Sequence, residues 1–193
     1  MGEPAGSAGA ELFERFHWRE GIGLAGEEQT REQNRLLVAG TTVSDITLLS
    51  TDYCNHLSEV VMIISMTADL PALIKDTKSW RPKTYAEHFE GSGLSIGPLA
   101  IQSYEISEDK FRQPFDNEVL AFNARVASAC EELASVIDSD DGDYIAYTAN
   151  ALSQGLQEIM NRIAAIANGA ILDDATADDG EGGMTQDDID DLF

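Results

Sequence analysis

Four polar side chains that could bind a ligand lie on one side of a segment expected to be helical. Asp52, Asn55, His56 and Glu59 occur at i, i+3, i+4 and i+7 in "DYCNHLSE", a spacing that places residues on one helix face. They could bind a metal or small ligand, and His56 could take part in phosphotransfer. The paired Glu-x-x-His copies of di-metal sites are absent. We therefore predict no metal, and the alternative is a polar face hydrogen-bonded to a neighbouring element.

A second group of reactive side chains lies in "SWRPKTYAEHF". Trp80, Arg81, Lys83, Tyr85 and His88 make this stretch the most cationic and aromatic part of an otherwise acidic chain. It could bind an anion or a partner. Alternatively, its aromatic side chains pack in the core while its cations balance nearby acids.

Sequence motifs of nucleotide hydrolysis and nucleophilic catalysis are missing. The chain has no P-loop, no G-x-S-x-G and no cysteine–histidine catalytic context, so we predict no cofactor. The formal charge is −23. Phosphate contacts need clustered Lys and Arg, so this charge argues against binding to nucleic acid.

The cysteines and the hydropathy of the chain indicate the cellular compartment of the protein. Cys54 and Cys130 have no paired spacing, which is typical of free, buried thiols in a reducing compartment. No secretory signal is visible, and the most apolar window, "VVMIISM", has seven residues, whereas a bilayer span needs about 20. These features predict a cytoplasmic protein with no membrane insertion.

Helices must position these side chains, because no stretch alternates with the period of two typical of strands. Apolar residues three and four apart predict a first long helix over residues 44–68, capped by Ser44, which would carry the polar face of His56. Asp69 is the expected cap of the next helix. Shorter helices are expected over residues 10–20, 27–40, 69–80, 81–93 and 97–105.

Two later segments have heptad-like apolar seams. The first seam consists of Phe111, Phe115, Val119, Phe122, Val126, Cys130, Leu133 and Ile137, and the second of Ile145, Leu152, Leu156, Ile159, Ile163 and Ile166. A short acidic turn joins them, which favours an antiparallel hairpin. We predict an all-α helical bundle with a long antiparallel hairpin and a disordered acidic tail.

The tail is acidic and ends in a separate amphipathic element. Residues 173–193 contain nine of the 35 acids and no base, so the rest of the chain still carries a formal charge of −14. In "TQDDIDDLF", Thr185 and Asp188 can form a capping box. Ile189, Leu192 and Phe193 then lie on one face of a short helix that would form mainly on docking.

The sequence "MTQDDIDDLF" resembles the Ser/Thr-Gln-(Asp/Glu)-(Asp/Glu)-Ile-Asp-Ala-Leu-(Leu/Phe) peptide of bacterial chemotaxis. That peptide occurs in the flagellar switch protein FliM and, after an acidic linker, in many CheZ phosphatases. The matching residues are Thr185, Gln186, Asp187, Asp188, Ile189, Asp190, Leu192 and Phe193, while Asp191 replaces the usual Ala. The resemblance covers about ten of 193 residues and implies docking on a CheY-type receiver domain.

The helical hairpin followed by a linker also resembles the CheZ phosphatases, but their catalytic segment is not found. That family uses a glutamine to orient the water that attacks a phosphoaspartate, and the nearest candidates are Gln154 and Gln157. Glu158 and Asn161 form the Glu-x-x-Asn spacing of unrelated receiver phosphatases. An acid–amide pair on one helix face could align a water by the same physics. Helix-surface amides without a special role are the alternative.

These patterns predict a leader over residues 1–9, a helical domain over 10–172, a linker over 173–183 and a docking peptide over 184–193. The expected function is a non-enzymatic signalling adaptor that binds a CheY-like receiver and could form a homodimer through its bundle. A divergent receiver phosphatase is the first alternative. A ligand- or metal-binding helical sensor centred on His56 is the second.

Overall fold

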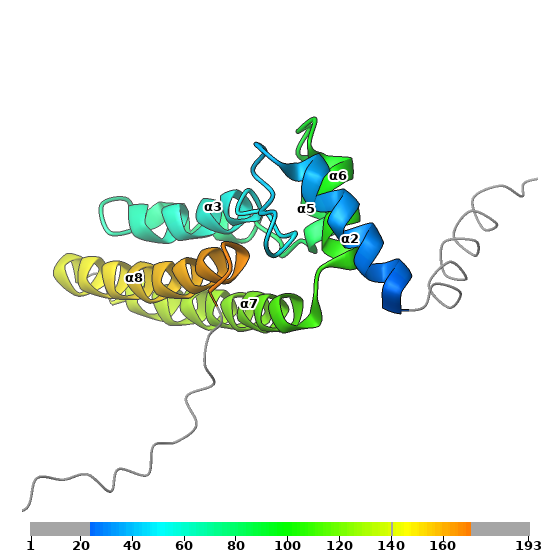
Figure 1. The fold of residues 1–193 in the computed structure, drawn as a ribbon. Helices are drawn as coiled ribbons and strands as arrows, with labels where there is room; N and C mark the ends of the chain where they lie inside the picture. The colour runs from blue at the N-terminus through cyan, green and yellow to red at the C-terminus, as the bar shows by residue number, and fades with distance from the viewer. Residues whose placement is uncertain (1–23, 140, 171–193) are drawn as a thin grey trace, which may run out of the picture.

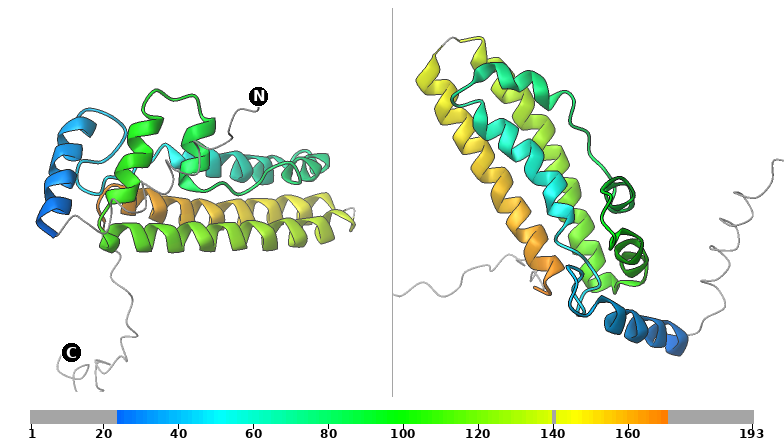
Figure 2. Two further views of the ribbon diagram at one scale, coloured as in Figure 1. Left: turned by 90° about the vertical axis from the view of Figure 1, so that its right-hand side faces the viewer. Right: turned by 90° about the horizontal axis from the view of Figure 1, so that it is seen from above.

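An antiparallel hairpin of two long helices forms one side of the described structure (Figures 1 and 2). In the computed structural model, α7 spans Asp109–Ile137 and α8 spans Gly142–Ala167, and the two pack along their whole length. Phe122, Leu133, Leu156 and Ile163 from the two seams are fully buried. Burying each such side chain stabilises the fold by about 1.5–3 kcal/mol. The predicted hairpin is confirmed.

The structure describes residues 24–139 and 141–170. The expected leader, the helix over 10–20, the linker 173–183 and the docking peptide 184–193 lie outside them. The described residues form α-helices, a short 3₁₀ turn and one isolated bridge between Val43 and Ser50, which confirms the all-α prediction. No helix within these two ranges has the length and apolar character needed to cross a membrane.

The third long element, α3, spans Tyr53–Met66 and packs against α8 (Figure 2). The predicted start at Ser44 is wrong. Residues before Tyr53 form a loop in which Ser44 Oγ accepts the backbone N–H of Thr47 at 3.3 Å and Leu48 adopts φ +62°. Thr47 Oγ1 donates to the carbonyl of Ala167 at 2.6 Å. The loop conformation is therefore held by contacts with α8, which local helix propensity does not include.

Short helices connect α3 to the hairpin. A 3₁₀ turn, Pro71–Leu73, leads into α4, Ile74–Thr77. The N-cap residue of the 3₁₀ turn is Leu70, so the prediction of Asp69 as the cap is wrong. α5, Tyr85–Gly91, begins with a capping box between Thr84 and Glu87. α6, Gly97–Ile106, lies close to α5, and the glycine at its start permits this approach, since a Cβ at Gly97 would lie only 2.9 Å from the carbonyl oxygen of Phe89.

One end of the bundle is covered by α2, Leu24–Val38, which packs against α6 (Figure 1). Gly40 follows this helix with φ +78°, the left-handed conformation expected of a glycine just past a helix end. Cys54 and Cys130 are free and half-buried. Burial raises the pKa of the Cys54 thiol to about 11.

Candidate functional site

His56 lies at the contact between α3 and the segment that leads into α5. Its side chain is 2% exposed, and its ring stacks on Trp80 with centroids 5.0 Å apart. Nε2 lies 3.0 Å from the carbonyl oxygen of Arg81, while Trp80 Nε1 donates to the backbone carbonyl of His56 at 3.2 Å. His56 therefore fastens residues 80–81 to α3.

The predicted polar face around His56 is only partly assembled. Glu59 Oε2 lies 3.3 Å from His56 Nδ1. Asp52 instead accepts a hydrogen bond from Thr42 Oγ1 at 2.6 Å, and Asn55 is exposed. No group of three or more His, Cys, Asp or Glu side chains within the described ranges could hold a metal ion. The structure thus brings together His56 and Glu59 but not the four predicted residues.

A second histidine, which sequence spacing did not connect with the first, lies beside it. The rings of His56 and His88 are 6.1 Å apart, and His88 meets the ring of Tyr53 edge-on. Burial lowers the pKa of both imidazoles, the nearby Lys83 lowers both further, and His56 lowers that of His88. The pair is therefore neutral near pH 7. Its residues come from different helices, so neither local pattern could reveal it.

The predicted catalytic amides lie on α8. Gln157 Nε2 donates to Asn161 Oδ1 at 3.0 Å. Gln154, Glu158 and Asn161 are exposed, and Gln157 is half-buried. The four residues therefore lie at an accessible surface of the hairpin, with one amide–amide contact already formed. The predicted partner-binding residues, Thr185–Asp190, Leu192 and Phe193, lie outside the described residues.

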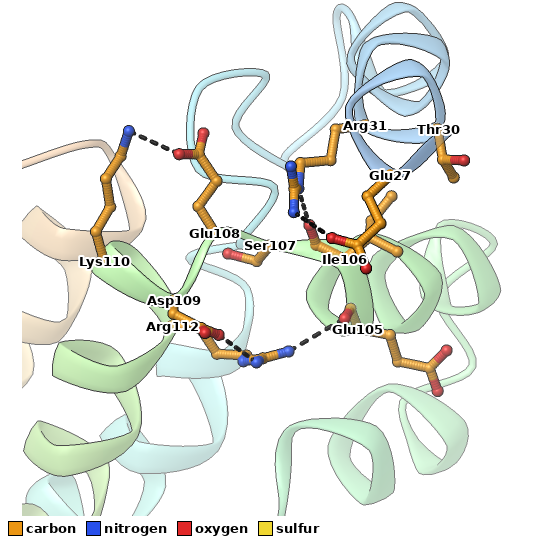
Figure 3. A pocket seen from close by; sticks show the side chains of 10 residues that line it. All are labelled: Glu27, Thr30, Arg31, Glu105, Ile106, Ser107, Glu108, Asp109, Lys110 and Arg112. Carbon is orange, nitrogen blue, oxygen red and sulfur yellow. Dashed lines mark hydrogen bonds and ion pairs between the residues drawn. The ribbon is translucent and has the colours of Figure 1, made fainter. Parts of the chain in front are cut away.

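A charged cleft of about 420 Å³ lies where α2, the end of α6 and the start of α7 meet (Figure 3). Arg31 Nε donates to the carbonyl of Ile106 at 3.0 Å, and Arg112 Nη1 donates to that of Glu105 at 3.1 Å. Two guanidinium groups thus satisfy carbonyls in the last turn of α6, where cations are favoured by the helix dipole.

Every cation of this cleft also has a carboxylate partner. Arg31 pairs with Glu27 at 3.3 Å, Arg112 pairs with Asp109, and Lys110 pairs with Glu108 at 2.8 Å (Figure 3). Because its positive charges are already matched, the cleft offers an anionic ligand little unpaired charge. Its arrangement is that of a structural joint between α2, α6 and α7.

An aromatic cleft of about 290 Å³ lies between residues 82–87, α6 and α7. Its lining includes Tyr53, Tyr85, Tyr104 and Phe115, and the rings of Tyr85 and Tyr104 stack 4.6 Å apart. Tyr104 donates its hydroxyl to Asp116 Oδ1 at 2.8 Å. Burial raises the pKa of Tyr53 to about 12 and also raises the pKa of Asp116. The sequence pointed to Tyr85 but not to this cleft, because its walls come from distant segments.

The segment before this cleft carries four exposed cations, Lys75, Lys78, Arg81 and Lys83, which we call the basic strip. None of them forms an ion pair with any residue of the described chain. Trp80, Tyr85 and His88 pack inward, as one of the two interpretations of "SWRPKTYAEHF" expects. The same interpretation expects the cations to balance local acids. Hydrogen bonds from Thr84 and, less strongly, Lys83 lower the pKa of Glu87, but no carboxylate of the described residues lies within ion-pair distance of any of the four cations. Arg81 Nη1 donates to the backbone carbonyls of Lys78 and Trp80 instead.

The whole chain was compared with known proteins. No protein-family model matches it, no curated protein is detectably similar to it, and no solved structure matches its fold.

Proposed function

We propose that this chain is a cytoplasmic signalling adaptor of bacterial chemotaxis or flagellar motility. It binds a CheY-type receiver domain through residues 184–193, and the helical body determines the consequence of binding. The observation that carries the proposal is the match of Thr185–Asp190, Leu192 and Phe193 to the receiver-docking peptide. Acids around an apolar stripe suit a groove with a basic rim.

The arrangement of the described chain supports tethered docking. The described part of the chain ends just after α8, and residues 171–183 separate it from the docking peptide. Thirteen residues span at most about 45 Å when extended. A receiver bound to the peptide would therefore remain within reach of the hairpin surface, so binding by the peptide would raise the receiver's local concentration there.

The test is a calorimetric titration of the full chain with a purified CheY-type receiver. We expect Phe193→Ala to weaken binding at least about tenfold, because large apolar anchors dominate such interfaces. Asp191→Ala is the matched control, since it restores the residue usual in the resembled peptide and should preserve binding. Equal affinities for the wild type and Phe193→Ala would exclude this docking mode.

A divergent receiver phosphatase is the second candidate. It is favoured by the contact of Gln157 with Asn161 on α8, beside the exposed side chains of Gln154 and Glu158. An amide held by a neighbouring side chain is suited to position an attacking water. These groups lie on α8, the last described helix before the tail in sequence.

This candidate is tested by the rate at which a phosphorylated receiver loses phosphate. The full chain should accelerate the loss of phosphate. Gln157→Ala or Glu158→Ala should reduce this acceleration at least about tenfold. Asn150→Ala alters another exposed amide of α8 and should have no effect. Absence of any acceleration by the wild type leaves the adaptor function alone.

A homodimer formed through the bundle remains a separate prediction. Sedimentation equilibrium of the full chain measures it directly, and a mass that stays at 20.9 kDa at all concentrations would contradict it. The adaptor function needs only one chain for each receiver.

A further inference from the structure

The basic strip stands out because all other described cations are ion-paired. Outside the strip these cations are Arg31, Arg35, Lys110, Arg112, Arg125 and Arg162, each within 4 Å of a carboxylate. The four cations of the strip lie within nine residues, and the only acid between Lys75 and Lys83 is Asp76. Unmatched positive charge on so acidic a chain indicates a site for an acidic partner.

The basic strip leads directly into the aromatic cleft, because Lys83 belongs to both. Leu120, which is 70% exposed, lies at the cleft together with Val119. The strip and cleft together therefore present cations beside an accessible apolar and aromatic surface. This combination suits a peptide that carries both acids and large apolar side chains.

The cleft also has an unused hydrogen-bond acceptor. Asn123 lines it, and its Oδ1 atom is buried with no hydrogen-bond partner in the described structure. A buried acceptor without a donor costs about 1–3 kcal/mol. A peptide N–H placed in the cleft could supply the missing donor.

The charge of the chain favours an occupant from the same molecule. Without residues 173–193 the chain still carries −14, so a free acidic protein is repelled at long range. The attraction of the strip is screened over about 10 Å in 0.1 M salt. A tethered acidic segment needs no long-range steering, because the tether raises its effective concentration at the strip to about the millimolar range.

The acidic tail fits this requirement in charge, apolar content and reach. Residues 173–193 have nine acids and no base, together with Ile189, Leu192 and Phe193. The linker can extend by about 45 Å, whereas α8, with 26 residues, is about 39 Å long. Tyr53 donates its hydroxyl to the carbonyl of Lys83 at 2.5 Å, and the loop before Tyr53 contacts the end of α8. Lys83 and the C-terminal end of α8, after which the tail follows in sequence, therefore lie at the same end of the bundle.

We propose that the acidic tail, residues 173–193, docks on its own helical body, with its acids on the basic strip and its apolar side chains in the aromatic cleft. The contact does not require a receiver. Where the receiver-binding function also holds, the docked tail competes with the receiver for the same peptide, so the free chain is autoinhibited.

Zero-length carbodiimide cross-linking of the full chain tests this contact without any receiver. The chain has four lysines, and Lys110, already paired with Glu108 at 2.8 Å, is the internal control (Figure 3). We expect mass spectrometry to find links from acids of residues 173–191 to Lys75, Lys78 or Lys83. Lys110 should link to Glu108. Phe193→Ala should lower the yield at Lys83 about fivefold, because it removes a docking anchor.

Three outcomes would overturn the proposal. One is a Lys110–Glu108 link with no link from the tail, and another is tail links to Lys110 alone. The third appears when isotopically light and heavy chains are mixed. In an equal mixture, light–heavy links as abundant as the light–light and heavy–heavy links together would assign the strip to the tail of a second copy. Because no receiver is present, each of these results leaves the receiver-docking proposal to its own titration.

Discussion

The cations at the α2–α6–α7 junction and those of the basic strip differ in what surrounds them. At the junction, Arg31 and Arg112 each bind a carboxylate and a helix-terminal carbonyl (Figure 3). In the strip, Lys78 and Lys83 are exposed and form no ion pair within the described residues. The junction is thus electrostatically complete, whereas the strip is not.

This difference separates a structural role from a binding role. Removing a cation whose partners are fixed leaves carbonyls and carboxylates uncompensated, so it should affect folding. Removing an exposed, unpaired cation leaves the native contacts intact and should affect only what docks there. Similar residue types therefore have opposite expected consequences in the two regions.

The largest effect is expected at a buried hydrogen bond beside the junction. Thr47 Oγ1 donates to Ala167 O at 2.6 Å, and Ser107 Oγ donates to Thr47 O at 2.7 Å, both in the buried interior. Thr47→Val leaves the carbonyl of Ala167 without its donor and should lower the free energy of unfolding by about 2 kcal/mol. Urea denaturation measures this loss. Thr51→Val, at a half-buried position of the same loop, is the control and should cost less.

The next effect concerns the strip and depends on both proposals. Replacing Lys75, Lys78 and Lys83 by Gln should raise the affinity of the full chain for the receiver. The increase is about tenfold if the docked form outnumbers the free form by roughly ten to one. Calorimetry compares this variant with Lys110→Gln, which alters a paired lysine. A rise with Lys110→Gln alone would reverse the roles of the two regions.

A smaller effect is expected when two charges are removed from each region in turn. The double variant Arg31→Gln, Arg112→Gln loses two caps of α6 and should destabilise the chain by about 1 kcal/mol, a modest value because the ion pairs are partly exposed. The double variant Lys78→Gln, Lys83→Gln changes the net charge equally. Measured in 1 M salt, which screens docking of the acidic tail on the strip, it should remain within about 0.5 kcal/mol of the wild type. Equal losses in both double variants would remove the distinction.

The smallest effect is expected from a change of pH, which acts through the two buried histidines. Burial lowers the folded-state pKa of His56 and His88, so the unfolded chain takes up protons first as the pH falls. The stabilisation is therefore complete above the unfolded pKa of about 6.5 and declines as the pH decreases below it. Because His56 holds residues 80–81, hydrogen exchange should increase in the strip before it increases at the junction.

Urea denaturation between pH 7.5 and 5.5 measures the global part of this effect. The double variant His56→Asn, His88→Asn should show a weaker pH dependence than the wild type over the same interval. If the double variant retained the full dependence, the two histidines would not be its source.

Sequence patterns predicted the long hairpin well, but they failed where contacts between residues far apart in the chain determine the local structure. The seams that include Phe122 and Leu156 became α7 and α8 because a sustained apolar stripe can be buried only by a partner helix. The helix expected from Ser44 begins at Tyr53 instead. There, Thr47 bonds to the end of α8 and Tyr85 accepts the backbone N–H of Ser50 at 2.8 Å, contacts that no local pattern contains.

The candidate site was predictable to a similar degree. The spacing of His56 and Glu59 correctly placed both on one helix side, and their atoms meet at 3.3 Å. Trp80 and the carbonyl of Arg81 contact His56 across about 25 residues of chain, so their approach could not be derived from spacing. The cationic stretch was visible in the composition, but its lack of carboxylate partners was not.

Local sequence was enough to predict the helical class, the hairpin, the acidic charge and the resemblance of residues 184–193 to a docking peptide, because periodicity, composition and short motifs are local properties. Tertiary structure alone decided which cations are neutralised, where His56 and His88 meet, and how Tyr85, Tyr104 and Phe115 form a cleft. These features depend on distances between segments far apart in the chain, and packing of the bundle sets those distances.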